Sequence, residues 1–411
     1  MSKVKVSQPK SSPKKRVLIL TADAGFGHRS AANAIQAALE ELYGGQVIVA
    51  VVNALDEPTT PSFLRDSQSD YDRWVRNVPE LYQLGYQASD NPVPTAILEQ
   101  SLIILLLETM HVLLDRYKPN VVVNTYPAYQ TPTLTALQRF KRSRIPFYTV
   151  ITDLSTIHRL WFDRRVTGCL VPNSIVAELA MSQGVDSSKV IVTGIPVAPA
   201  ISHETRNKNK IRKELGWLPD IPTVLAVGSK RVDRLMDTLN VINHFGSDLQ
   251  LAIVAGNDDV VYKELSHVDW HIPAYIYNFV ENMPTLLKAS DLLVCKAGGL
   301  ILTEALACGL PMMLIEVIPG QETGNAEYVT AYGAADIAQS PIEVLETLRH
   351  LMKNDQSLLK KRGLNAALMG KPRSAFDTAE ILWKVMQTKP RAKKAPLPTP
   401  PLSSDDLPKE G

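Results

Sequence analysis

The chain has few cysteines and no pattern that would join them. Cys169, Cys295 and Cys308 are the only three in 411 residues, and each lies in an apolar run. Three scattered thiols do not form a disulfide framework or a zinc site of the usual spacing, and buried reduced cysteines are typical of cytosolic proteins. The sequence therefore excludes a small disulfide-stapled domain and favours a cytoplasmic location.

An excess of charge of one sign is also absent. The chain holds 44 Lys and Arg against 42 Asp and Glu, so its net charge of +2 gives no global reason to expect a nucleic-acid partner. Positive charge is concentrated in residues 1–15, which are rich in lysine and contain no acidic residue. This segment is either a solvated, disordered tail or one attracted to anionic lipid headgroups.

Long hydrophobic runs are missing as well. The longest, Leu102 to Leu107, is bracketed by polar residues, whereas a membrane span needs about 20 predominantly apolar residues. No secretory cleavage pattern follows the lysine-rich start. We therefore expect a protein that does not cross a membrane.

Residues 58–110 combine aromatic side chains with arginines. Trp74 and several tyrosines alternate with Arg65, Arg73 and Arg76, and an apolar helix is predicted from Ile97 to Leu114. Such a mixture suits a surface that contacts a membrane interface and admits lipid. The alternative is a pair of helices that simply cap a sheet.

The first glycine loop lacks the third glycine of a dinucleotide fingerprint. Residues 16–22 predict a buried strand, residues 23–28 a loop containing Gly25, Gly27 and His28, and the following apolar spacing a helix that ends at Gly44. No acidic residue ends the next strand in the expected way. A nicotinamide dehydrogenase is therefore disfavoured.

Strand and helix patterns alternate along most of the chain, and its 45% hydrophobic content is enough for two cores. The alternation predicts two Rossmann-like domains with parallel sheets, at residues 16–200 and 201–388, the second including the terminal helices. Residues 389–411 are too proline-rich and polar to pack, so we expect them to be disordered.

Residues 294–328 contain a second and more informative turn. An apolar strand, Asp291 to Cys295, leads into Gly298 and Gly299 and then a helix that carries Glu304. Glycines at such a turn allow a ligand close to the backbone, and the helix start offers free N–H groups to a phosphate. Glu304, one turn further on, can hydrogen-bond a ribose diol. Taken alone, the glycines also fit an ordinary βαβ unit.

The whole string K-A-G-G-L-I-L-T-E-A-L-A-C-G-L-P, followed by I-P-G-Q-E-T-G-N, resembles the nucleotide-sugar site of family-28-type glycosyltransferases. That group includes monogalactosyldiacylglycerol synthases and processive diacylglycerol glucosyltransferases. Two segments of the first half resemble the same family. They are G-F-G-H-R-S-A-A at residues 25–32 and T-D-L-S-T-I-H-R-L-W at residues 152–161.

The resemblance implies a GT-B fold, with two facing Rossmann-like domains and catalysis between them. It implies inverting transfer of a hexose from a UDP-sugar to a lipid hydroxyl, most simply that of diacylglycerol. His28 is then the general base, since a neutral imidazole near pH 7 suits this task, and Asp153 orients or stabilises it. The alternatives are that His28 only caps or packs the helix start, and that Asp153 only caps a turn.

The resemblance also assigns the ligand-binding residues. The acceptor side comprises Gly27, Tyr126, His158 and Trp161. The donor side comprises Gly228, Ser229, Lys230, Val280, Lys296, Gly298, Gly299, Thr303, Glu304, Gln321, Glu322 and Asn325. Of these, Glu304 is the ribose ligand, Gln321 and Glu322 are sugar ligands, and the start of the helix at Gly298 and Gly299 holds the diphosphate.

One loop departs from the family. Relatives usually carry several glycines after the first strand of the second domain, where this chain has Gly228-Ser229-Lys230-Arg231. The two cations either replace backbone N–H groups near the diphosphate or are simply solvated. This departure keeps open a catalytically silent protein that binds a nucleotide or lipid. A UDP-sugar 2-epimerase of the same fold is the second alternative.

The expected partners are a UDP-sugar, a lipid acceptor and an anionic membrane surface contacted peripherally from the cytoplasmic side. We expect no cofactor and no metal, because helix N–H groups and cations can stabilise a leaving diphosphate and no paired-aspartate metal motif occurs in a suitable loop.

Overall fold

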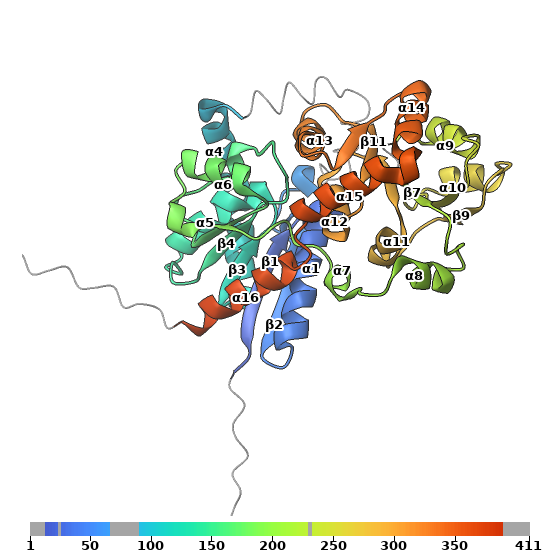
Figure 1. The fold of residues 1–411 in the computed structure, drawn as a ribbon. Helices are drawn as coiled ribbons and strands as arrows, with labels where there is room; N and C mark the ends of the chain where they lie inside the picture. Colours follow the sequence, from blue (N-terminus) through green and yellow to red (C-terminus); the bar gives the residue numbers. More distant parts are fainter. Residues whose placement is uncertain (1–12, 24–25, 66–89, 229–231, 389–411) are drawn as a thin grey trace, which may run out of the picture.

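The computed structural model describes residues 13–23, 26–65, 90–228 and 232–388. Within them, two parallel β-sheets lie side by side, each covered by helices on both faces (Figure 1). The basic tail, much of the aromatic insertion, Ser229 to Arg231 and the proline-rich tail fall wholly or largely outside the described residues.

The first sheet has the strand order β2-β1-β3-β4-β5-β6. Its strands are β1 Lys15–Thr21, β2 Val47–Asn53, β3 Val121–Asn124, β4 Phe147–Val150, β5 Gly168–Val171 and β6 Val190–Val192. The second sheet has the order β12-β11-β10-β7-β8-β9. Its strands are β7 Thr223–Val227, β8 Gln250–Val254, β9 Ala274–Tyr277, β10 Leu292–Lys296, β11 Met312–Glu316 and β12 Ala335–Ile337. All paired neighbours in both sheets are parallel.

These strands form because their apolar runs are continuous. Residues 17–21 of β1 and all of β3, β4 and β8 are buried, as expected where helices cover both faces of a parallel sheet. The free thiols of Cys169 and Cys295 are part of this buried interior, as predicted. The predicted α/β class with two Rossmann-like sheets is confirmed.

Helices connect the strands. In the first half they are α1 Phe26–Tyr43, η1 Ala54–Asp56, α4 Pro92–Tyr117, η2 Pro127–Tyr129, α5 Gln130–Arg139, η3 Arg159–Trp161, α6 Ser174–Ser182, η4 Ser187–Lys189 and α7 Ala200–His203. In the second half they are α8 Lys208–Leu215, α9 Leu235–Asn243, α10 Asp259–Ser266, α11 Met283–Ala289, α12 Gly299–Cys308, α13 Gln321–Ala331, α14 Pro341–Met352, η5 Asn354–Gln356, α15 Ser357–Met369 and α16 Ser374–Gln387.

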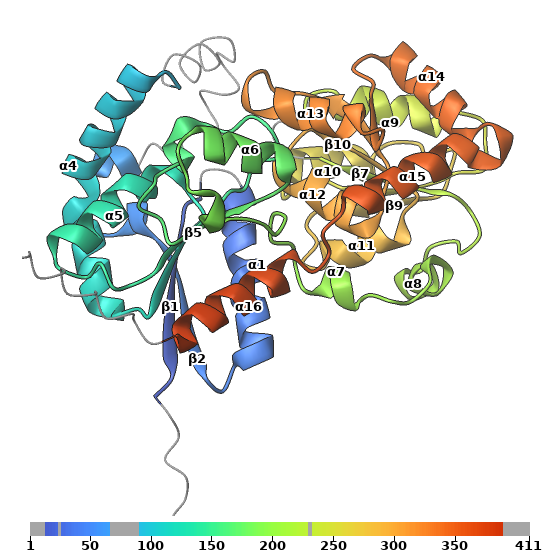
Figure 2. The same cartoon turned by 60° about the vertical axis from the view of Figure 1, so that its left-hand side comes forward.

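The last helix returns to the first domain. We predicted the terminal helices as part of residues 201–388, but α16 packs along α1 (Figure 2). Phe376, Ala379 and Leu382 of α16 share a buried cluster with Val17 and Ile19 of β1. The chain therefore crosses between the domains twice, and α16 ties the end of the second domain to the first.

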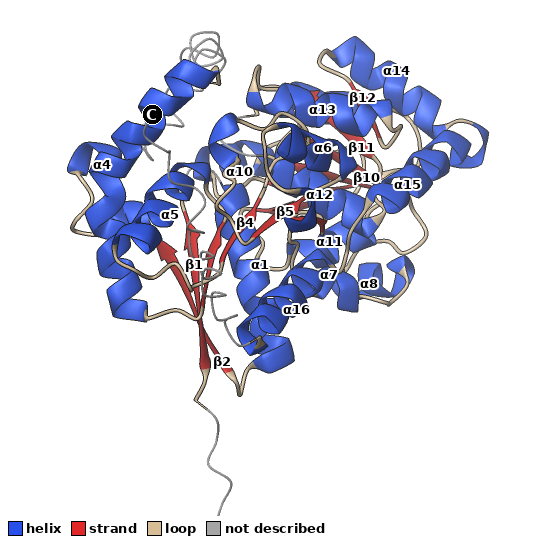
Figure 3. Ribbon diagram, turned by 90° about the vertical axis from the view of Figure 1, so that its left-hand side faces the viewer, coloured by secondary structure: helices blue, strands red, loops and turns tan. Residues whose placement is uncertain are grey.

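The long helix α4 lies at the outer side of the first domain (Figure 3). Leu106, Met110 and Leu113 on one face are buried in the core. Contrary to the expectation from run length, α4 is long and apolar enough to cross a membrane, with mean hydropathy 1.7 over its most apolar window. Only 33% of that window is buried. Core helices of globular proteins can pass the same test, so the buried face of α4 accounts for part of its hydrophobicity.

Candidate active site between the domains

The predicted site residues follow the carboxyl ends of strands in both sheets. In the first sheet, the order reverses between β1 and β3, and in the second between β10 and β7. Open α/β sheets bind ligands at such positions. His28 follows β1, Tyr126 follows β3, Lys296 ends β10 and Gly228 follows β7. The topology thus places the two motif regions at the ligand-binding edges of their sheets.

Thr152, a residue to which the sequence assigned no role, contacts His28 in the first turn of α1. His28 Nδ1 lies 2.7 Å from Thr152 Oγ1, just beyond the end of β4. Its backbone carbonyl accepts a hydrogen bond from Thr125 Oγ1 at 3.2 Å. In the tautomer that carries its proton on Nδ1 and donates it to Thr152 Oγ1, the other ring nitrogen, Nε2, has the lone pair that can take a proton.

Burial lowers the pKa of His28 below its usual 6.5, and the negative charge of Asp153 opposes this shift. The imidazole is therefore neutral near pH 7, as a general base must be. Asp153 is itself 8% exposed, so its charge acts across a poorly hydrated space. Asp153 thus favours the protonated form of the imidazole.

An ion pair closes the glycine loop that precedes His28. Arg29 donates from Nε to Asp23 Oδ1 at 2.7 Å and from its terminal nitrogen to Oδ2 at 2.8 Å. Asn53 Nδ2 reaches Asp23 Oδ2 at 3.0 Å. Two parallel hydrogen bonds fix a guanidinium firmly, so this pair holds the two ends of residues 23–29 together.

The predicted acceptor-side residues surround His28 unequally. The ring of Tyr126 meets His28 edge-on, with centroids 5.1 Å apart, and Trp161 lies 6.1 Å away. Trp161 is only 1% exposed, so most of it is core. His158 Nδ1 accepts from the N–H of Leu160 at 3.2 Å and caps η3, and burial lowers its pKa. His158 therefore shapes this loop.

The glycine turn of the second domain opens α12. Gly298 is the N-cap and Gly299 the first helical residue, and the first N–H groups of a helix have no partners within it. Thr303, a predicted donor ligand, bonds through Oγ1 to Gly299 O at 2.7 Å, so its hydroxyl faces its own helix. The turn offers a phosphate its backbone N–H groups and the positive end of the helix dipole.

The side-chain carboxyl of Glu304 has no hydrogen bond or ion pair with any part of the chain that the structure describes. It is half-buried, and burial raises the pKa of its carboxyl to about 7. A carboxylate without partners in a desolvated place is costly for the folded protein. Hydroxyl donors from a ligand would relieve that cost, which fits the predicted ribose contact.

Lys296 and Glu322 form an ion pair across the same site. The second oxygen of Glu322, Oε2, accepts the N–H of Ile318 at 3.1 Å. The Glu322 side chain is 8% exposed and that of Lys296 19%. The pair links the end of β10 with the first turn of α13, which begins at Gln321.

Three other predicted donor residues have different surroundings. Gly228 donates its N–H to Val254 O at 2.8 Å. Val280 packs against the core of the second domain. Asn325 is 2% exposed and bonds to backbone groups of both domains. Ser229, Lys230 and the side chain of Gln321 lie outside the described part of the structure.

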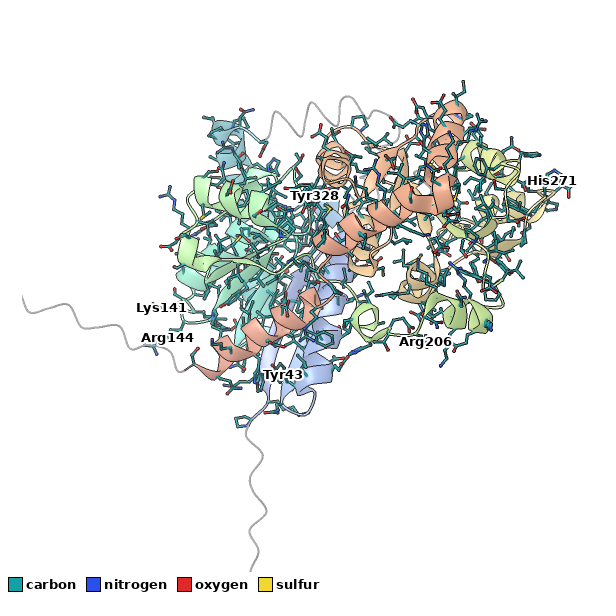
Figure 4. All side chains as sticks on the ribbon, in the orientation of Figure 1. Tyr43, Lys141, Arg144, Arg206, His271 and Tyr328 are labelled. Carbon is teal, nitrogen blue, oxygen red and sulfur yellow. The ribbon has the colours of Figure 1, made fainter. Side chains whose placement is uncertain are left out.

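The two domains touch where their motifs meet. A Cβ placed on Gly299 would lie 3.3 Å from Thr152 O, and one on Gly27 would lie 4.0 Å from Leu300 Cβ. Gly324 has no room for a side chain because Thr156 fills the space. Tyr328 on α13 also lies at this junction (Figure 4) and interacts with the Asn173 side chain. The segment that holds the base and the glycine turn of the second domain therefore lie against each other where the domains touch.

Among the described residues, no group of three or more His, Cys, Asp or Glu side chains is arranged to hold a metal ion. The titratable groups gathered here include the imidazole of His28, the amine of Lys296 and the carboxyl groups of Asp153, Glu304 and Glu322. These groups suit proton transfer and hydrogen bonding to a polyol.

Sequence comparisons identify relatives of both halves. Residues 28–197 match the family described as monogalactosyldiacylglycerol (MGDG) synthase. Residues 223–375 match the glycosyltransferase family 28 C-terminal domain. The chain is 31% identical over 386 residues to monogalactosyldiacylglycerol synthase 3, chloroplastic, of Arabidopsis thaliana, covering 92% of this chain and 83% of that protein.

This chain belongs to the monogalactosyldiacylglycerol synthase family. The spinach (Spinacia oleracea) protein monogalactosyldiacylglycerol synthase, chloroplastic, is also 31% identical, over 94% of this chain and 76% of its own length. The family resemblance predicted from the motifs is thereby confirmed.

Solved structures support the fold of this family member. MurG of Acinetobacter baumannii has a TM-score of 0.57 at 15% identity and covers 90% of this chain and all of its own. A putative UDP-N-acetylglucosamine 2-epimerase from Listeria monocytogenes has a TM-score of 0.59 at 14% identity, with 92% and 98% coverage. The predicted GT-B fold is confirmed. Transferases and epimerases share this architecture, so the fold alone does not choose between them.

Proposed function

We propose that the protein is an inverting glycosyltransferase that moves a hexose from a UDP-sugar to the free hydroxyl of diacylglycerol. Its curated relatives are named as synthases of a galactosyl diacylglycerol. The observation that carries the proposal is the position of His28, whose ring is fixed by Thr152 beside the glycine turn of the second domain. Direct displacement requires a base on the acceptor side of the reacting carbon and a phosphate-binding turn on the donor side.

In the proposed reaction, Nε2 of His28 removes the proton of the lipid hydroxyl as its oxygen attacks the anomeric carbon. The bond from that carbon to the UDP oxygen breaks as the new bond forms, and the configuration inverts. Asp153 stabilises the resulting imidazolium by its charge. The negative charge on the departing diphosphate is met by the N-terminus of α12 and by Lys296.

The donor is held by the second domain. Glu304 accepts hydrogen bonds from the ribose, and Glu322 binds hydroxyls of the hexose. Gly298 and Gly299 allow the diphosphate close to the helix start. We propose that this arrangement needs no metal, because backbone N–H groups and a lysine supply the positive potential.

The two alternatives make different predictions. An epimerase would need no lipid, and a silent binding protein would bind donor without releasing UDP. The family match favours the transferase over the epimerase, since the sequence relatives are named monogalactosyldiacylglycerol synthases. His28 with its Thr152 contact argues against the silent protein.

The direct test is UDP release from a panel of UDP-hexoses, with vesicles that contain or lack diacylglycerol. We expect release that depends on diacylglycerol, and the best donor names the hexose. Release without lipid would indicate hydrolysis or another acceptor. Saturable donor binding with no release from any sugar would support the silent protein.

We further propose that the enzyme contacts the membrane peripherally, from the cytoplasmic side, through α4. Val93, Ile97 and Ile104 on this helix are 70%, 65% and 80% exposed. Their spacing of four and seven residues puts them on one helical face. The first turns of α4 extend beyond the rest of the domain in two views (Figures 2 and 3). An apolar stripe of this kind suits insertion into a lipid interface.

Replacing Ile97 and Ile104 together with aspartate should weaken vesicle binding about 100-fold or more, because each buried isoleucine contributes roughly 1.5–3 kcal/mol. Co-sedimentation with vesicles measures the effect. Ile342→Asp is the matched control, since Ile342 is 70% exposed on a helix of the second domain. Equal loss of binding in the control would mean that α4 is not the contact surface.

A further inference from the structure

The side chain of Asn325 forms a buried polar link between the domains. This residue lies on α13 and is 2% exposed. Its Oδ1 accepts the backbone N–H of Leu154, in the first domain, at 3.2 Å. Its Nδ2 donates to the backbone carbonyl of Ala297, in the second domain, at 3.3 Å. One amide therefore spans the interface with both of its ends engaged.

The partners fix the orientation of this amide. Leu154 offers an N–H, which only an oxygen can accept, and Ala297 offers a carbonyl, which only a donor can satisfy. A rotated amide would lose both bonds. The arrangement is thus specific to asparagine at this position.

The segment that Asn325 holds is the one that carries the partners of His28. Thr152 Oγ1 bonds to His28 Nδ1. The charge of Asp153 opposes the lowering of the His28 pKa by burial. Leu154 is fixed from its other side too, because its carbonyl accepts from Asn173 Nδ2 at 2.7 Å. Backbone movement at Leu154 would therefore shift both groups that act on the base.

The segment bonded to Nδ2 leads directly into the donor turn. Ala297 precedes Gly298 and Gly299, and the Cβ position of Gly299 lies 3.6 Å from Asn325 Nδ2 and 3.3 Å from Thr152 O. Asn325 is thus the point at which the phosphate-binding turn and the base-bearing loop are fixed relative to each other.

We propose that Asn325 is a positioning residue that aligns His28 with the donor site when the two domains are closed. This inference rests on the proposed transferase activity and replaces the expected role of Asn325 as a direct donor ligand. Opening the domains breaks the bond to Leu154 and leaves the bond to Ala297 intact. The base is then aligned with the donor in the closed arrangement only.

The test compares Asn325→Ala and Asn325→Leu with wild type in three measurements. We expect kcat to fall about 10- to 100-fold, because small displacements of a catalytic group are costly. The Kd for UDP, measured by calorimetry, should stay within about twofold, since no donor contact is lost. Amide hydrogen exchange at Leu154 should become about 10-fold faster, because its acceptor is gone.

Asn365→Leu is the matched control. Asn365 is half-buried on α15 and donates from Nδ2 to Gly333 O at 2.9 Å, a bond within the second domain. This variant should keep wild-type kcat and wild-type exchange at Leu154. It separates loss of a cross-domain bond from general loosening of the second domain.

Other outcomes overturn the inference. A Kd for UDP or UDP-hexose that rises in parallel with the loss of kcat/KM would make Asn325 a donor ligand. Wild-type kcat together with faster exchange at Leu154 would show that the link does not align the base. Should wild-type protein transfer no hexose, the proposed function fails; unchanged exchange at Leu154 would separately show that Asn325 does not hold the loop.

Discussion

Replacing His28 with alanine is expected to abolish hexose transfer while leaving UDP binding intact. The base lies on the first domain and contacts Thr152, whereas the proposed donor contacts come from the second domain. Loss of a general base costs roughly 10²- to 10⁴-fold in rate. Initial rates of diacylglycerol-dependent UDP release and calorimetric titration with UDP measure the two quantities. Transfer at near wild-type rate in His28→Ala would remove the assigned base.

The pH dependence gives an independent check on the base. Burial holds the pKa of His28 below 6.5, so kcat at saturating UDP-hexose, where the pH dependence of donor binding drops out, should stay level as pH falls through 6.5 and decline only at lower pH. Asp153 raises this pKa, so Asp153→Asn should move the acid limb to still lower pH. An acid limb that moves to higher pH in Asp153→Asn, or a pH profile with no acid limb, contradicts the assignment of His28 as the general base.

Thr152→Val tests the hydroxyl that holds His28. Valine has nearly the same shape and lacks the oxygen, so the ring loses its Nδ1 partner with little change in packing. We expect kcat to fall about 10-fold with an unchanged Kd for UDP, as for a residue that orients the base. Thr125→Val is a suitable control, because the Thr125 hydroxyl bonds the backbone carbonyls of His28 and Leu20, and the substitution keeps the Thr125 backbone that contacts the ring.

The parts of the fold that could be predicted are those encoded locally. Runs such as residues 121–124 and 250–254 are apolar throughout, and a parallel sheet buried on both faces demands this pattern. Glycine turns after two strands marked the ligand-binding edges. These features depend on neighbours in sequence, so they can be recognised without coordinates.

The features that escaped prediction depend on partners far apart in the chain. The pattern of α16 shows a helix with an apolar face but does not say that Val17 and Ile19 lie opposite it. Thr152 was visible as a hydroxyl after a strand, yet its bond to His28 joins residues 124 positions apart. Asn325 fitted a donor motif, and its two backbone partners lie in different domains. Spacing cannot reveal such pairs.

Glu304→Gln is expected to stabilise the empty protein and to weaken donor binding. The folded pKa of Glu304 is about 7, against a usual 4.5. A raised carboxyl pKa means that the folded state holds its proton more tightly, so the free energy of unfolding decreases as pH rises from about 4.5 to about 7. Glutamine carries no charge and removes this dependence. At pH 8 we expect a gain of roughly 1–3 kcal/mol, measured as a higher unfolding midpoint.

The same carboxylate should make donor binding depend on pH. Ribose hydroxyls donate best to the ionised form, so the Kd for UDP should rise as pH falls below about 7, and binding near pH 6.5 should release a proton. Calorimetry in buffers of different ionisation enthalpy detects that release. In Glu304→Gln, the Kd should be about 10- to 100-fold higher than wild type at pH 8, since a hydrogen bond to a charged group contributes about 1.5–3 kcal/mol.

Two comparisons decide whether Glu304 binds the ribose or acts at a distance. UDP that lacks its ribose hydroxyls should bind wild type and Glu304→Gln almost equally, because the interaction partner is absent in each case. Glu99→Gln is the control for burial, since Glu99 is a half-buried carboxyl whose pKa is also raised by burial but which lies on the first domain. It should leave UDP binding unchanged. If UDP without its ribose hydroxyls still binds wild type more tightly than Glu304→Gln, the carboxylate affects donor binding by a route other than the ribose.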